Sequence, residues 1–154
     1  MTLTLCLTRD HLDVIARLAV GHSHDRIGRA LGIAAVTVRA RIRAAARSVG
    51  ITDGDLAPQL VDYAVLHGYV GARRRAPALP PQPLHPERQA VLDALARGLS
   101  ARATATELGI PLRTVNTHRG RLYELLQVHT AAHAVARARL HGYLNDPPHT
   151  PEFP

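Results

Sequence analysis

Apolar residues along the chain recur at the spacing of short amphipathic helices. Between residues 86 and 96 they fall at i, i+1, i+4 and i+5, which places them on one face of a helix. The next stretch, 101–108, follows Ser100, a preferred N-cap residue, and precedes Gly109, which can take the left-handed conformation that ends many helices. Apart from a brief alternation at 2–7, no strand pattern occurs. These signals predict an all-α fold.

Four helices are expected in each half of the chain. In the first half they lie at about 10–20, between Ser23 and Gly32, at about 35–48 and at 56–66. In the second half they run from Pro86 to just before Gly98, over 101–108, from Pro111 to about 126, and over about 130–141. Each half joins two short helices through a glycine turn, and the second of these helices carries basic residues. This is the helix-turn-helix arrangement.

The two halves also resemble each other residue by residue. Residues 7–49 align with residues 84–126 without a gap, and the identities fall at turn and core positions. They include Leu31-Gly32-Ile33 with Leu108-Gly109-Ile110, and Thr37-Val38 with Thr114-Val115. Each half then ends in the same string, Leu-His-Gly-Tyr, at 66–69 and 140–143. Chance similarity between alanine-rich helices does not explain strings shared at a fixed distance, so we interpret the chain as a tandem repeat.

The segments outside the repeat set the expected domain boundaries. Residues 71–83 contain four prolines and three consecutive arginines, which predicts a semi-rigid linker. The proline-rich tail, 145–154, is expected to be disordered. The expected domains are therefore a first module at 1–70 and a second at 84–144. Extended at roughly 3.1 Å per residue, the linker reaches about 40 Å, enough to place the modules one DNA turn of about 34 Å apart.

Composition narrows the classes of function. The net charge is +7 and all 19 basic residues are arginine, which makes nucleic acid or an acidic surface a candidate partner. A high-GC coding sequence would also favour arginine and alanine, so composition alone leaves both explanations open. A single cysteine, Cys6, excludes an intramolecular disulfide and a multi-cysteine zinc site. No apolar run approaches a membrane span and the start does not resemble a secretory signal, so we expect a cytoplasmic protein.

Residues 86–126 carry three motifs in order. They are Gly98-Leu99-Ser100, Leu108-Gly109-Ile110 and Thr114-Val115-Asn116-Thr117-His118. With these motifs the segment resembles the LuxR/GerE-type helix-turn-helix domain. The first half resembles it more loosely through Gly21-His22-Ser23, Leu31-Gly32-Ile33 and Thr37-Val38-Arg39-Ala40-Arg41. The resemblance implies two tandem four-helix modules of the LuxR C-terminal type, similar to winged-helix and homeodomain-like folds, which bacterial transcription regulators use to bind DNA.

The chain departs from the family pattern at several positions. The family has Thr-Pro-x-Glu at its first helix, whereas the Glu position holds His11 in the first half and Arg88 in the second. The basic residue after Thr-Val is Arg39 in the first half but Asn116 in the second, and Arg41 stands where the family has His. Many members also carry a receiver or ligand-sensing domain, which we do not expect in this chain. The sequence therefore does not indicate a regulating signal.

The resemblance implies which residues would contact double-stranded DNA. Positions i, i+1 and i+4 of the third helix match the family's base-reading positions. They are Arg39, Ala40 and Arg43 in the first half and Asn116, Thr117 and Gly120 in the second. Arginine can bond guanine and asparagine adenine, so the two halves should read different sequences. Phosphate contacts are expected from Thr37, Arg47, Arg113, Thr114 and Arg121. Val115 and His118 are expected to turn inward, toward the second helix of their half.

Other interpretations start from the same residues. The arginines could belong to a solvated face with carboxylate partners, but residues 34–50 contain no acid. The ten histidines are scattered, and His22 with His24 alone makes a poor metal site, so we expect no enzyme, metal or cofactor. A pair that has lost base reading could instead be an adaptor for RNA polymerase, a sigma factor or another regulator. The fourth helices could form a homodimer or pack the two halves together, through Tyr63, Leu66, Leu140 and Tyr143.

Overall fold

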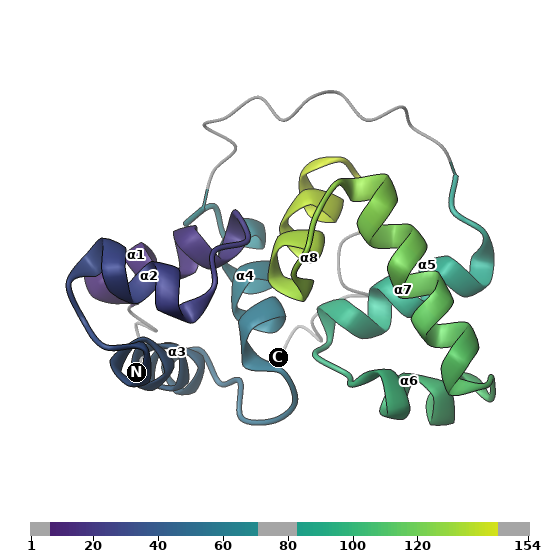
Figure 1. Ribbon diagram of the computed structural model, residues 1–154, viewed down its shortest axis with the longest axis horizontal. Coiled ribbons are helices and arrows are strands. Elements are labelled where there is room, and N and C mark those ends of the chain that lie inside the picture. The colour runs from purple at the N-terminus through teal and green to yellow at the C-terminus, as the bar shows by residue number, and fades with distance from the viewer. Residues whose placement is uncertain (1–6, 71–82, 145–154) are drawn as a thin grey trace, which may run out of the picture.

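The computed structural model describes residues 7–70 and 83–144, and within these ranges it consists of eight α-helices and no strands (Figure 1). The first four helices are α1 (Arg9–Ala19), α2 (His24–Leu31), α3 (Ala35–Ser48) and α4 (Leu56–Leu66). The second four are α5 (Pro86–Ala96), α6 (Ala101–Leu108), α7 (Leu112–Leu126) and α8 (Ala131–Leu140). The prediction of an all-α fold is confirmed. The expected tail, and the expected linker except for Pro83, lie outside the described residues.

Local hydrogen bonds explain where the helices begin. The side chains of six N-cap residues accept a hydrogen bond from a backbone N–H in the first turn; these residues are Thr8, Ser23, Asp55, His85, Ser100 and Thr130. Pro111, expected as the first residue of its helix, is instead the N-cap of α7 because its ψ of 145° is extended. The side-chain caps at the other helix starts satisfy N–H groups that have no partner within the helix.

A capping box at the start of α1 explains one departure from the family pattern. The hydroxyl of Thr8 accepts from the N–H of His11, and the ring Nδ1 of His11 accepts from the N–H of Thr8, both at 3.3 Å. Glutamate or glutamine usually supplies the second of these bonds. A neutral histidine therefore replaces the expected glutamate in this structural role.

The described residues enclose two aliphatic cores. The first is surrounded by α1–α4 and includes the fully buried side chains of Ile15, Ile27, Val38 and Leu60. The second is surrounded by α5–α8 and includes those of Leu92, Val115, Leu122 and Leu126. Each set of four helices therefore buries apolar side chains of its own, as expected for compact helical units.

The fourth helices of the two sets pack against each other. In the centre of the molecule α4 and α8 lie side by side, with α1–α3 on one side and α5–α7 on the other (Figure 1). Ala132 and Ala136 of α8 are buried in the first core, so their methyl groups contribute to the opposite set of helices. Of the two arrangements left open by the sequence, the structure shows the one in which the halves pack together. No helix of the described ranges is long and apolar enough to span a membrane.

Candidate nucleic-acid interface

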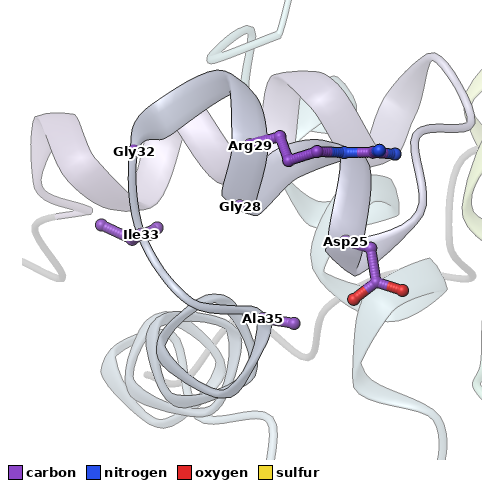
Figure 2. Close-up of a pocket in the computed structure, with 6 residues that line it drawn as sticks. All are labelled: Asp25, Gly28, Arg29, Gly32, Ile33 and Ala35. Atoms are coloured by element: carbon purple, nitrogen blue, oxygen red, sulfur yellow. The ribbon is translucent and has the colours of Figure 1, made fainter.

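The turn between α2 and α3 sets the direction of α3. Gly32 ends α2 in the left-handed conformation, with φ 68° and ψ 32°, and the N–H of Ile33 donates to the carbonyl of Gly28 at 2.9 Å. Figure 2 shows Gly32 and Ile33 in this turn, with Ala35 at the start of α3, beside an open depression of about 690 Å³. A Cβ on Gly28 would lie 2.6 Å from the Ile33 carbonyl oxygen, so this glycine is required by close packing.

The turn between α6 and α7 has the same construction. Gly109 is left-handed, with φ 64° and ψ 32°, and the N–H of Ile110 donates to the carbonyl of Ala105 at 3.2 Å. A Cβ at Gly109 would meet nothing within 4 Å, as at Gly32. These glycines are therefore selected by backbone conformation rather than by lack of space. The turns that join α2 to α3 and α6 to α7 therefore share the same backbone geometry.

The outward face of α3 is basic. Val38 and Ile42 face the first core, whereas Arg39, Ala40 and Arg43 are exposed. Arg39 and Arg43 line an open hollow of about 210 Å³ together with residues of the loop before α4. Thr37 and Arg47 are exposed on the same helix. In the part of the chain that the structure describes, no carboxylate lies within ion-pair distance of the guanidinium groups of Arg39, Arg43 and Arg47.

The outward face of α7 is polar but less charged. Asn116, Thr117 and Gly120 are exposed, while Val115 is fully buried. The hydroxyl of Thr117 donates to the carbonyl of Arg113 at 2.9 Å, which occupies its donor and leaves its methyl group for an outside contact. The open space around Gly120 would accept a side chain. Of the expected phosphate contacts here, Arg113 and Arg121 are exposed and Thr114 is half-buried.

Equivalent contacts to a carboxylate connect each third helix to the first helix of its set. In the first set, Arg41 Nη2 lies 3.4 Å from Asp10 Oδ2 on α1. In the second, His118 Nε2 lies 3.1 Å from Glu87 Oε2 on α5. The residues of these pairs occupy matching positions of the repeat. The arginine that replaces the family's histidine therefore keeps a structural contact with a carboxylate.

His118 is buried, as expected. Its expected direction toward α6 stays a prediction, and its ring Nε2 makes a hydrogen bond with the carboxylate of Glu87 on α5, which was not expected. The stripe pattern shows only which side of α7 faces inward. Which neighbouring helix supplies the partner depends on how α5 and α6 cross α7.

Two further arginines position the second set of helices and were missed by the sequence analysis. Arg119 Nη2 donates to the carbonyl of Leu99 at 2.7 Å, which links α7 to the turn between α5 and α6. Arg97 makes two hydrogen bonds to Glu107, at 3.0 and 2.8 Å. These bonds hold the pKa of the Glu107 carboxyl below its ordinary value. Their sequence separations match no helical spacing, so no local signal identifies them.

The histidines among the described residues form no metal-binding cluster. Within residues 7–70 and 83–144, no three His, Cys, Asp or Glu side chains are grouped so that they could hold a metal ion. Burial and the nearby Arg26 and Arg17 lower the pKa of His22. The neutral form that this favours is compatible with its place in the turn before α2.

The family comparison coincides with the second set of helices. Residues 83–138 match the GerE family model, described as bacterial regulatory proteins of the luxR family. A LuxR-family helix-turn-helix domain occupies these residues. The match begins at residue 83, after the end of α4, so it does not assign the first set of helices. No curated protein and no solved structure matched the chain. The family suggests a role in DNA-binding transcription regulation.

Proposed function

We propose that the chain is a sequence-specific regulator of transcription that binds double-stranded DNA through two tandem helix-turn-helix modules. The first module would comprise residues 1–70 and the second residues 84–144, joined by a linker at 71–83. The α3 and α7 helices would each enter a major groove. Its action would be binding rather than catalysis, with no cofactor or metal.

The observation that carries this proposal is the equivalence of α3 and α7. Both follow a left-handed glycine turn, and both are held to the first helix of their set by a side-chain contact with a carboxylate at the same repeat position. In the family, the helix at the place of α7 is the one that reads DNA. Since α3 is built in the same way and carries the more basic exposed face, it is the better electrostatic match for a phosphate-lined groove.

The exposed residues fall into two groups, one expected to contact DNA bases and the other to contact the phosphate backbone. Arg39 and Arg43 would each bond guanine through two hydrogen bonds, and Asn116 would bond adenine. The methyl groups of Ala40 and Thr117 would meet thymine methyls, whereas Gly120 would let the backbone approach a base pair without a side chain. Phosphates would be held by Thr37, Arg47, Arg113, Thr114 and Arg121.

Binding of duplex DNA to the full chain tests this function. A selection from random duplexes should yield a defined sequence, and raising the salt concentration should weaken binding because counterions are released. The double variant Arg39→Ala/Arg43→Ala should lose most of its sequence preference. Arg9→Ala/Arg26→Ala removes the same charge from exposed positions of α1 and α2 and should keep that preference.

Two results would contradict the proposal. If no sequence is enriched from the random duplexes, the chain is not a sequence-specific reader. If DNA binding is unchanged in Arg39→Ala/Arg43→Ala, the face of α3 does not read bases, and an adaptor that binds RNA polymerase, a sigma factor or another regulator becomes the better explanation.

A further inference from the structure

The interface between α4 and α8 contains a well-shielded ion pair. Arg139 Nε donates to Asp62 Oδ1 at 2.6 Å, and Arg139 Nη2 donates to Asp62 Oδ2 at 3.2 Å. The Asp62 side chain is 16% exposed and that of Arg139 is 9% exposed. This two-bond geometry is the strong form of an arginine–carboxylate contact, and it joins the two sets of helices directly.

Two other contacts across this interface are related by the repeat: each joins the turn after the first helix of one set to the fourth helix of the other set. The turn at Gly21 lies against His133 of α8, and the turn at Gly98 lies against Gln59 of α4. Gly21 and Gly98 are equivalent in the repeat. Counted back from the shared Leu-His-Gly-Tyr strings, Gln59 and His133 are equivalent too. When residue i of one unit contacts j of the other and the reverse also holds, the two units are related by an approximate two-fold axis.

The ion pair is the feature that breaks this symmetry. By the same count, the position equivalent to Asp62 in α8 is Ala136, and the position equivalent to Arg139 in α4 is Val65. If α8 packed against α8 of a second chain, Arg139 would face Ala136 instead of a carboxylate. If α4 packed against another α4, Asp62 would face Val65. Both pairings would bury a charge without an opposite charge beside it, which is unfavourable.

We propose that the chain is a self-contained pseudo-dimer. The Asp62–Arg139 pair favours packing of the two different modules of one chain over symmetric packing of like modules from two chains. Resting on the function proposed above, this predicts the form of the target. One chain binds one duplex that carries two unlike half-sites in inverted orientation. They are inverted because an approximate two-fold axis relates the readers, and unlike because Arg39 and Arg43 correspond to Asn116 and Gly120.

Selection from random duplexes with the full chain tests the arrangement of the target. The expected product holds two different motifs, inverted and at one spacing, with one chain per duplex by sedimentation of the complex. Inserting about 5 base pairs, roughly half a DNA turn, between the motifs should lower affinity about tenfold or more, because both modules can no longer bind together. A direct repeat, a true palindrome or two chains per duplex would overturn the inference.

Failure of this inference can be told apart from failure of the proposed function. Enrichment of one motif, or of two motifs in direct orientation, keeps sequence-specific binding and rejects the pseudo-dimer. Enrichment of no motif rejects the function itself. Sedimentation of the chain without DNA gives an independent answer, since a self-contained pseudo-dimer should be monomeric.

Charge reversal tests the role of the ion pair. Asp62→Arg and Arg139→Asp should each abolish the dependence on spacing while leaving binding to a single half-site, because α3 and α7 are unchanged. The exchanged variant Asp62→Arg/Arg139→Asp should restore the dependence. Asp93→Arg makes the same charge change at an exposed position of α5 and should behave as the parent.

Circular dichroism separates loss of coupling from loss of fold in these variants. If a single reversal unfolds the chain, the exchanged variant still decides. Its recovery of both helicity and spacing dependence supports the pairing role, and its failure to recover either one rejects it.

Discussion

At the scale of single residues, the same side-chain type serves different purposes at neighbouring positions. Arg39 and Arg43 are exposed without a carboxylate partner among the described residues, whereas Arg41 between them is held by Asp10. The difference follows from the helix, because residues two apart point to different sides. Charge alone therefore does not identify a DNA-contacting arginine. The direction and the partners of each arginine are needed as well.

This difference leads to a prediction for Arg43. Arg43→Ala should weaken specific binding by roughly 1–3 kcal/mol and relax the preference at one base pair. Fluorescence anisotropy with duplexes varied one base pair at a time would measure both effects. Arg41→Ala is the matched control, and we expect it to lower stability without changing base preference. An equal loss on all duplexes in Arg43→Ala would show that Arg43 contacts phosphate only.

At the scale of elements, the two glycines inside α2 and α7 differ in whether packing requires them. Gly28 lies where α2 approaches the following turn so closely that a Cβ would crowd the Ile33 carbonyl. Gly120 lies inside α7, where a Cβ would meet nothing within 4 Å. The first glycine supports the turn. The second weakens its helix, and the packing of the described residues does not require it.

Alanine substitution should therefore have opposite effects at these two positions. Gly120→Ala should raise the free energy of unfolding by about 1 kcal/mol, because alanine is the better helix former. Gly28→Ala should lower it by roughly 1–3 kcal/mol through overpacking at the turn. Urea denaturation followed by circular dichroism would measure both. A stabilised Gly28→Ala would mean that the turn relaxes easily, against the packing described here.

At the scale of the whole molecule, contacts between the two sets of helices determine how α3 and α7 are placed relative to each other. The N–H of Asp55, before α4, donates to the carbonyl of Gly98 after α5 at 2.8 Å. On the other side, His133 of α8 lies against the turn at Gly21. Burial, Arg137, His129 and His22 lower the pKa of His133. This side of the interface therefore favours a neutral imidazole.

The stability of the molecule should consequently fall in acid. The unfolded chain returns His133 to an ordinary pKa near 6.5, so it binds a proton before the folded chain does as the pH decreases. Stability should be complete above that pH and should decline as the pH falls toward the lowered folded-state pKa. Urea denaturation at several pH values should show a smaller decline for His133→Gln, which carries the residue found at the equivalent position of α4.

A control variant makes the pH prediction specific. His67→Gln changes an exposed histidine at the end of α4 and should leave the pH dependence as in the parent. If His133→Gln has the same pH dependence as the parent, then His133 does not couple the interface to protonation.

Local sequence patterns were sufficient to predict the helices of this protein and the faces that they expose. Helix starts at Ser23 and Ser100 depend on side-chain hydrogen bonds within a few residues, and helix ends at Gly32 and Gly109 depend on local backbone angles. The apolar spacing shows which side of each helix turns inward. The LuxR-type helix-turn-helix domain in the second half of the chain was also identified from its motifs, in agreement with the family match at 83–138.

Which helix surfaces pack against each other is seen only in the tertiary structure. It showed α4 against α8 of the same chain, the Asp62–Arg139 pair between them, and the carboxylate that receives His118. No periodicity encodes these partners, because each depends on how two helices distant in sequence cross and on which side chains their packing brings into reach. The order of the helices follows from local interactions, whereas the placement of α3 relative to α7 follows from long-range packing.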